Sequence, residues 1–228
     1  MSGAGAAAGG RFPRCVLFDL DGTLLDSAPD MAATVNRMRA ARGTGPMPLA
    51  ELRQHVSRGA RAMSAAAFPE LNGEVPPEMI KEFLAVYGEE LGRHGAAFDG
   101  IEAMLAALEA DGARWGIVTN KPEYLARGLM PSLGWERRCG VLIGGDTLAE
   151  RKPHPLPLLH AAQAMGFAVA DSVYVGDDER DILAARAAGM RSLVALWGYR
   201  LQHDDPLTWQ ADAMAAEPAD LLDADTWP

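Results

Sequence analysis

An apolar run at residues 15–18 ends abruptly in two carboxylates, Asp19 and Asp21, and a glycine follows them. An unbroken apolar run that stops at polar residues is typical of a buried strand in a parallel sheet. Such sheets bind ligands at the carboxyl ends of their strands, so both carboxylates are expected at the mouth of the sheet. Their two-residue spacing points the side chains the same way on an extended backbone, and Gly22 lets the chain turn so that both face one small volume.

Two carboxylates in one site repel each other, and both stay ionised near neutral pH only if a cation shares the site. Mg²⁺ is the expected ion, because it prefers a few carboxylate oxygens, keeps several waters and is often completed by a substrate phosphate. Asp19 can then act as a covalent nucleophile through an aspartyl-phosphate, while Asp21 protonates the leaving group and later activates water. The alternative is a strand followed by an acidic turn that caps a helix.

The pentapeptide Asp19–Thr23 resembles the first motif of the haloacid dehalogenase (HAD) superfamily of phosphatases. Thr119 ends the apolar run at residues 115–118 and resembles the second motif, in which a hydroxyl and backbone amides hold the phosphoryl oxygens. A capping threonine would look the same. Lys152 resembles the third motif, where a lysine balances the crowded negative charge. Arg151 competes for that role, but the Lys-Pro pair favours Lys152.

The acidic stretch at residues 176–181 follows another apolar run and resembles the fourth motif, Gly-Asp-Asp-x-x-Asp. The resemblance implies that Asp177 binds the metal and that Asp178 and Asp181 orient this shell. A surface acid cluster is the alternative, but four motifs in order, each at a strand end, favour the superfamily. The implied site has Mg²⁺ on Asp19, the backbone carbonyl of Asp21, and Asp177, with the phosphoryl oxygens contacted by Thr23, Thr119, Asn120 and Lys152.

Residues 26–95 carry no strand signal and predict an all-helical insert directly after the first strand. This insert resembles the helical (C1-type) cap of the superfamily's first subclass. Arg58, Gly59 and Arg61 form the candidate specificity loop, because two arginines beside a glycine at a helix start suit an anion. Surface arginines in water are an alternative of equal weight. The expected helices run from an N-cap at Ser27 to Gly43, and over residues 49–56, 59–68 and 76–94.

The rest of the chain alternates helices with short strands, which predicts an α/β fold with a doubly wound parallel sheet. We assign residues 12–25 and 96–228 to this HAD core, and residues 1–11 to a flexible tail. Asp146 is expected to be an ordinary turn residue.

The formal net charge of −10 over 228 residues offers no basic stripe for nucleic acid. No apolar segment approaches the length that spans a bilayer, and the Ala/Gly-rich start lacks the features of a signal peptide. Cys15 and Cys139 are expected to be structural thiols in a reducing compartment. We therefore expect a cytoplasmic monomer or homodimer whose partner is a small phosphorylated metabolite.

Within the superfamily the chain most resembles the phosphoglycolate phosphatase group. The blocks at residues 57–63, 115–122 and 209–212 look closer to N-acetylmuramic acid 6-phosphate phosphatases of peptidoglycan recycling, which predicts that substrate. The stretches at 143–146 and 152–155 fit phosphoglycolate phosphatases equally well, and phosphoglycolate is the alternative. A sugar-phosphate mutase of the same superfamily is a nearer rival than a phospho-accepting receiver domain, which has no use for a helical insert.

Overall fold

The structure is a computed structural model that describes residues 10–201 and 203–228. Apart from Gly10 and Arg11, the tail expected over residues 1–11 lies outside the described residues. None of the helices in the described residues combines the length and the apolar character needed to cross a membrane.

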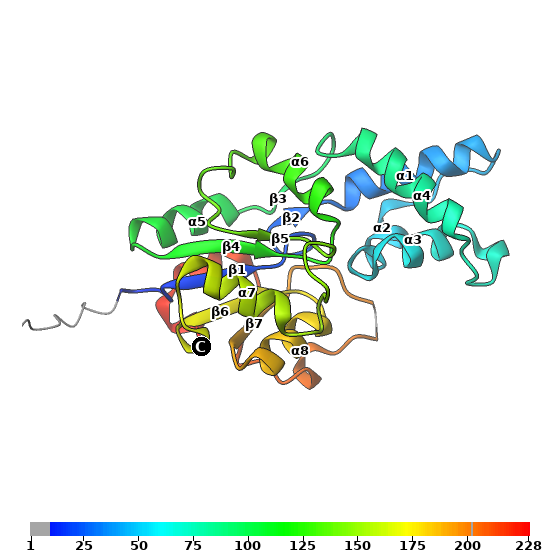
Figure 1. The fold of residues 1–228 in the computed structure, drawn as a ribbon. Helices are drawn as coiled ribbons and strands as arrows, with labels where there is room; N and C mark the ends of the chain where they lie inside the picture. Colours follow the sequence, from blue (N-terminus) through cyan, green and yellow to red (C-terminus); the bar gives the residue numbers. More distant parts are fainter. Residues whose placement is uncertain (1–9, 202) are drawn as a thin grey trace, which may run out of the picture.

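A six-stranded sheet forms the centre of the molecule, in the order β5-β4-β1-β6-β7-β8 (Figure 1). Every neighbouring pair in this sheet is parallel, which confirms the expected α/β doubly wound fold. The strands are β1 (Cys15–Phe18), β4 (Arg114–Val118), β5 (Leu142–Ile143), β6 (Ser172–Gly176), β7 (Arg191–Ala195) and β8 (Ala213–Ala215).

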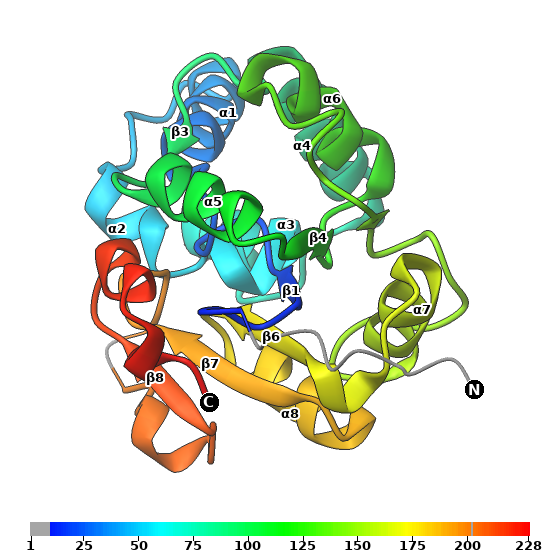
Figure 2. The same cartoon turned by 90° about the vertical axis from the view of Figure 1, so that its left-hand side faces the viewer.

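Helices cover both faces of the sheet, and the side chains of β1 alternate between them. Val16 and Phe18 pack in one apolar cluster with residues of α5 (Ile101–Ala110) and α6 (Glu123–Leu133). Cys15 and Leu17 pack in another with residues of α7 (Leu156–Met165) and α8 (Glu179–Ala188). Figure 2 shows α5 and α8 on opposite sides of the sheet. Burial on both faces explains the unbroken apolar run, and it fixes the point at which Asp19 leaves the sheet.

A group of helices beyond the carboxyl ends of the strands forms the cap (Figure 1). Two predicted helices are shorter than expected: the one starting at Leu49 ends at Arg53, and the one reaching His94 ends at Glu90. Ser27 occupies the N-cap position, but its buried hydroxyl has no hydrogen-bond partner among the described residues. The elements are α1 (Ala28–Ala41), α2 (Leu49–Arg53), the 3₁₀ turn η1 (Val56–Arg58), α3 (Gly59–Ala67), the 3₁₀ turn η2 (Pro69–Leu71) and α4 (Pro77–Glu90).

Two short strands join the cap to the core, and the sequence pattern did not predict them. β2 (Leu25–Asp26) pairs antiparallel with β3 (Ala96–Ala97), so the outgoing and returning linkers run side by side. Asp30, in the first turn of α1, is fully buried and holds the returning linker. Its carboxylate accepts hydrogen bonds from three backbone N–H groups, at 2.8 Å (Gly92), 2.6 Å (His94) and 3.1 Å (Gly95). This anchoring explains why α4 stops before His94.

Candidate active site

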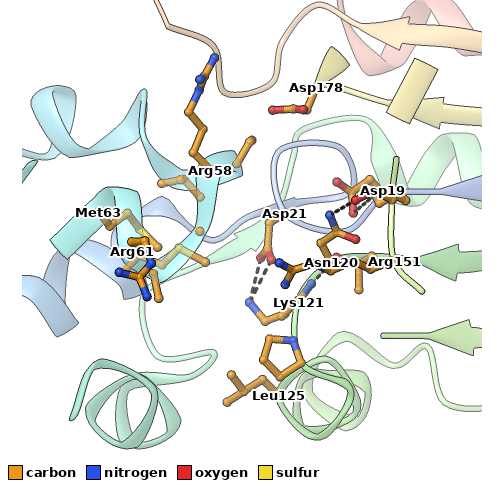
Figure 3. Close-up of a pocket in the computed structure, with 18 of the residues that line it drawn as sticks. Asp19, Asp21, Arg58, Arg61, Met63, Asn120, Lys121, Leu125, Arg151 and Asp178 are labelled. Carbon is orange, nitrogen blue, oxygen red and sulfur yellow. Dashed lines mark hydrogen bonds and ion pairs between the residues drawn. The ribbon is translucent and has the colours of Figure 1, made fainter. Parts of the chain in front are cut away.

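A cavity of about 590 Å³ lies between the cap and the carboxyl ends of the strands (Figure 3). The core contributes the polar side chains expected from the motifs. The cap contributes a mainly apolar wall. The core residues are Asp19, Asp21, Thr119, Asn120, Lys152, Asp178 and Asp181, and the apolar cap residues are Met31, Val56, Met63, Ile80, Phe83 and Leu84.

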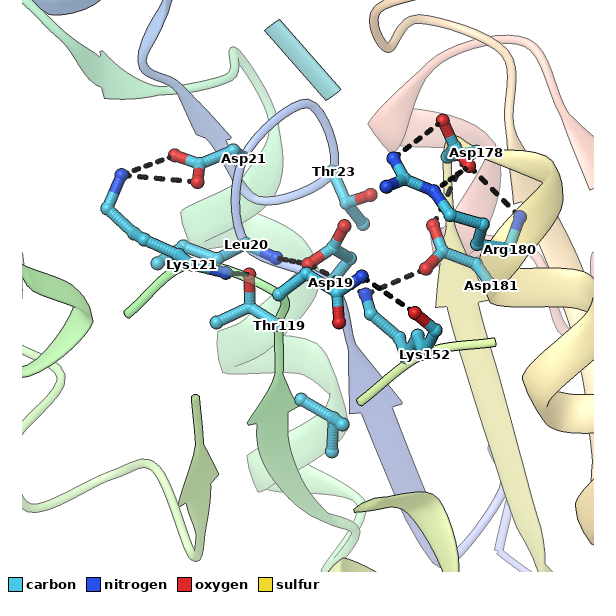
Figure 4. A network of polar contacts seen from close by, with 12 residues as sticks. Asp19, Leu20, Asp21, Thr23, Thr119, Lys121, Lys152, Asp178, Arg180 and Asp181 are labelled. Carbon is cyan, nitrogen blue, oxygen red and sulfur yellow. Dashed lines mark hydrogen bonds and ion pairs between the residues drawn. The ribbon is translucent and has the colours of Figure 1, made fainter. Parts of the chain in front are cut away.

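Asp19 lines the cavity at the end of β1, and one of its carboxylate oxygens is held in place. Oδ1 accepts a hydrogen bond from the backbone N–H of Leu20 at 2.7 Å and lies 3.0 Å from the Lys152 ammonium (Figure 4). In the described part of the chain no donor contacts Oδ2. The two oxygens therefore differ: Oδ1 is fixed by the protein, and Oδ2 is free to accept a further contact.

The Lys152 ammonium uses all three of its protons on protein acceptors. It pairs with Asp19 and, at 2.7 Å, with Asp181, and it donates to the Tyr174 hydroxyl at 2.7 Å. Burial lowers the pKa of Lys152, but the two carboxylates outweigh burial and raise the pKa above its ordinary value. Lys152 thus serves the acidic cluster as a fixed positive charge. Figure 4 shows it between the two carboxylates.

Three carboxylates converge at the cavity: ligand oxygens of Asp19, Asp177 and Asp181 all lie within 4.8 Å of one another. Burial and the neighbouring charges raise the pKa of Asp177 well above its ordinary value, and burial raises that of Asp181 to about 6. Three carboxylates face one ammonium, so two negative charges are unbalanced when all are ionised. A hard divalent cation with oxygen ligands fits this donor set, and Mg²⁺ is the ion expected from the sequence.

Asp177 is held rigidly by groups from three parts of the chain. Its carboxylate accepts hydrogen bonds from the Thr23 hydroxyl (3.0 Å), the Ser57 hydroxyl (3.0 Å) and the backbone N–H of Tyr199 (2.9 Å). Gly22 has φ +89°, and a Cβ there would lie 2.3 Å from an Asp177 oxygen, so only glycine fits. Thr23 is fully buried and does not line the cavity. The expected contact of Thr23 with phosphate stays a prediction, and the contact that its hydroxyl makes in the structure is with Asp177.

Asp178 and Asp181 begin α8 with a capping box, in which each side chain accepts from a backbone N–H of that turn. Asp178 also pairs with Arg180 at 2.8 Å (Figure 4). Burial raises the pKa of Asp178, but Arg180 outweighs burial and lowers the pKa below its ordinary value. Both acids were expected behind the metal ligands. In the structure Asp178 lines the cavity and contacts Arg180, whereas Asp181 joins the carboxylate cluster itself.

Comparison with known proteins identifies the family of this chain. The family model of the haloacid dehalogenase-like hydrolases matches residues 16–195, which include all four motifs. The chain belongs to the haloacid dehalogenase-like hydrolases, and it is a phosphatase, a phosphoric monoester hydrolase.

Curated relatives carry two names. A phosphoglycolate phosphatase of Xanthomonas campestris pv. campestris is 62% identical and aligns over 96% of this chain and 99% of its own. An N-acetylmuramic acid 6-phosphate phosphatase of Pseudomonas aeruginosa is 42% identical over 92% of this chain and 93% of its own. Among solved structures, one described as a predicted phosphoglycolate phosphatase from Haemophilus somnus superimposes with a TM-score of 0.80. It is 26% identical and covers 93% of this chain and 97% of its own.

Thr119 and Asn120, which follow β4, both line the cavity, and Asn120 joins their loop to the loop that carries Lys152. The Thr119 hydroxyl accepts from the backbone N–H of Lys121 at 3.2 Å. The Asn120 amide donates to the carbonyl of Lys152 at 2.9 Å, and its buried oxygen Oδ1 has no partner among the described residues.

Asp146, expected to be an ordinary turn residue, accepts from the N–H of Glu123 at 2.7 Å and so fixes the start of α6.

Lys121 and Tyr87 belong to the site of this phosphatase, although the sequence analysis assigned them no role. The Lys121 ammonium is buried and pairs with both oxygens of Asp21, at 2.9 and 3.1 Å (Figure 4). It also donates to the hydroxyl of Tyr87, which is 2% exposed and comes from cap helix α4. A contact of cap and core thus orients Asp21. The sequence signal was a lysine two residues after the motif threonine.

The candidate specificity loop of this HAD phosphatase lies at the cavity, but both of its arginines already have partners. Arg58 pairs with Asp204 at 3.1 Å, and its side chain is 46% exposed. Arg61 donates to the carbonyl of Val75 at 2.8 Å. Gly59 has φ +80°, which favours glycine at this joint. The loop lines the cavity, and both of its arginines already contact acceptors within the protein.

Proposed function

We propose that this phosphatase hydrolyses a phosphomonoester that carries a carboxylate, through an aspartyl-phosphate on Asp19, and that phosphoglycolate is its substrate. The observation that carries the mechanism is the held carboxylate of Asp19, with Oδ1 fixed and Oδ2 without a donor at the cavity. The substrate follows from the relatives at 62% identity, which are named phosphoglycolate phosphatase. This order reverses the expectation from the sequence blocks, which placed N-acetylmuramic acid 6-phosphate first.

In the first half of the reaction Oδ2 of Asp19 attacks phosphorus, the ester P–O bond breaks, and Asp21 gives its proton to the departing oxygen. In the second half Asp21 takes a proton from water, whose oxygen attacks phosphorus. Inorganic phosphate then leaves, and the Asp19 carboxylate is restored. Lys121 and Tyr87 hold Asp21 at the cavity wall for both proton transfers.

The remaining residues stabilise charge and exclude water. Mg²⁺ bound to Asp19, the backbone carbonyl of Asp21, and Asp177 would neutralise charge on the transferring phosphoryl group. Thr119 and Asn120 line the cavity close to Asp19 and offer polar contacts to the phosphoryl oxygens. The apolar wall of the cap excludes bulk water and strengthens these electrostatic contacts.

The size of the cavity favours N-acetylmuramic acid 6-phosphate as a second candidate. Phosphoglycolate has a single methylene between its phosphate and its carboxylate, whereas a cavity of about 590 Å³ accommodates a much larger alcohol. Apolar cap residues such as Met63 and Phe83 also suit the apolar face of a sugar better than glycolate.

Phosphate release from a panel of substrates tests the proposal. Purified protein with Mg²⁺ is assayed on phosphoglycolate, N-acetylmuramic acid 6-phosphate and N-acetylglucosamine 6-phosphate, and an Asp19→Asn preparation controls for contaminating phosphatases. We expect kcat/KM to be highest for phosphoglycolate. A higher value for N-acetylmuramic acid 6-phosphate selects the second candidate. A preference for the sugar phosphate without a carboxylate contradicts the proposal, and isomerised sugar phosphate without release indicates a mutase.

A further inference from the structure

Basic side chains at the cavity are the groups that can bind a substrate carboxylate, and most of them are already occupied. Among the residues that the structure describes, six basic ones line the cavity, and five of these contact acceptors of the protein. These five pairs are Arg58 with Asp204, Arg61 with the carbonyl of Val75, Lys121 with Asp21, Lys152 with Asp19 and Asp181, and Arg180 with Asp178.

Arg151 is the sixth. Within residues 10–201 and 203–228 its side chain forms no ion pair and no hydrogen bond, although it lines the cavity. Figure 3 shows it next to Asn120, on the same side of the pocket as Asp19. A guanidinium presents five N–H donors in a planar fork that matches the two oxygens of a carboxylate. An unoccupied arginine in the wall of a substrate cavity is therefore suited to bind an anionic group of the substrate.

The position of Arg151 in the chain relates it directly to the reacting phosphate. The Cα atoms of consecutive residues lie about 3.8 Å apart, so the side chains of Arg151 and Lys152 start from neighbouring points. Lys152 reaches the nucleophile, at 3.0 Å from Asp19. Arg151 and Asp19 line the same cavity, so a carboxylate only a few bonds from a phosphate at Asp19 is the group that Arg151 is expected to reach. Phosphoglycolate has this short spacing.

We propose that Arg151 binds the carboxylate of the substrate and is the main determinant of the preference for carboxylate-bearing phosphomonoesters. This inference rests on the proposed function. It assigns carboxylate recognition to the core loop before Lys152, whereas the cap arginines Arg58 and Arg61 maintain contacts within the protein.

Arg151→Met removes the charge and keeps most of the side-chain length, and Arg151→Lys keeps the charge but loses the fork. Arg14→Met is the matched control. Arg14 is exposed and directly precedes β1, so it lies at the end of that strand opposite to Asp19. The substrates form two comparisons: phosphoglycolate against p-nitrophenyl phosphate, and N-acetylmuramic acid 6-phosphate against N-acetylglucosamine 6-phosphate, which lacks the carboxylate-bearing lactyl group.

Arg151 is exposed in the structure. We expect Arg151→Met to lower kcat/KM for the carboxylate substrate that the wild type prefers by roughly 10- to 150-fold, the range for losing a hydrogen bond to a charged group. The matched substrate without a carboxylate should change by less than about threefold, and Arg151→Lys should recover part of the loss. Equal losses on both substrates of a pair would overturn the proposal.

A binding measurement separates failure of this inference from failure of the proposed function. Calorimetry with Mg²⁺ compares phosphonoacetate, which has a carboxylate, with methylphosphonate, which has none. Wild type should bind phosphonoacetate more tightly, and Arg151→Met should abolish the difference, whatever substrate the enzyme turns over. If the difference persists in Arg151→Met, or is absent from the wild type, Arg151 does not bind the carboxylate.

Discussion

Replacing Asp30 tests how firmly the returning linker is tied to the cap. The Asp30 carboxylate is fully buried and accepts three backbone hydrogen bonds from residues 92–95, at 2.6 to 3.1 Å. Asp30→Ala removes the acceptor for all three donors. Asp30→Asn keeps one oxygen as an acceptor but replaces the other with an NH₂ group, which cannot accept from the backbone N–H donors of the linker.

Hydrogen bonds to a charged group contribute about 1.5–3 kcal/mol each to the free energy of unfolding, so three set an upper limit of about 5–9 kcal/mol. His94 and Gly92 are exposed, so water can satisfy part of the released N–H groups. We therefore expect Asp30→Ala to cost about 3–5 kcal/mol and Asp30→Asn about 1.5–3 kcal/mol. For a chain of this length the larger loss lowers Tm by roughly 6–20 °C.

Urea unfolding, followed by far-UV circular dichroism and tryptophan fluorescence, gives the free energy and the m-value. Asp99→Ala is the control, because Asp99 is an exposed aspartate near the same linker, and it should change stability by less than about 0.5 kcal/mol. A loss below about 1 kcal/mol for Asp30→Ala, at an unchanged m-value, would show that the linker does not depend on this carboxylate.

Three further predictions concern catalysis. Asp19→Asn should reduce turnover to about a thousandth or less without lowering Tm, because an amide cannot form the acyl-phosphate; greater residual phosphate release refutes the covalent role. Chelation by EDTA should abolish activity and excess Mg²⁺ restore it, with Ca²⁺ a poor substitute because of its larger and looser shell; full activity in chelator contradicts the metal site. Tyr87→Phe removes the hydroxyl that holds Lys121, so kcat/KM for alkyl phosphates should fall about 3- to 10-fold. The value for p-nitrophenyl phosphate should hardly change, because its leaving group needs no proton from Asp21.

Local sequence patterns predicted the parts of the site that depend on single strands. The apolar run before Asp19 required burial on both faces, and the carboxyl ends of parallel strands meet at one edge. The resemblance to the fourth HAD motif placed Asp177 on the same metal as Asp19. Asp177 follows β6, which pairs with β1, and the ligand oxygens of the two aspartates lie within 4.8 Å of each other.

Contacts that depend on how the cap sits on the core could not be predicted in this way. Lys121 and Tyr87 are 34 positions apart, on a core loop and a cap helix, and no local period relates them. The partner of Arg58 is more remote still, since Asp204 lies 146 positions after Arg58 in the chain. Ser27 has a typical capping side chain, but its hydroxyl is buried without a partner, so tertiary packing outweighed the local preference.

Tyr199 limits how freely the cap of this enzyme can be exchanged with that of a relative. Its hydroxyl donates to Asp26 at 2.7 Å and accepts from the N–H of Ala28 at 3.0 Å, while its backbone N–H donates to Asp177. The guanidinium of Arg53 lies over its ring, at 5.3 Å from the centroid, and also pairs with Asp26. A chimera that joins a foreign cap to this core must therefore carry Asp26 and Arg53 with it, or it leaves Tyr199 without the partners that seat it beside Asp177.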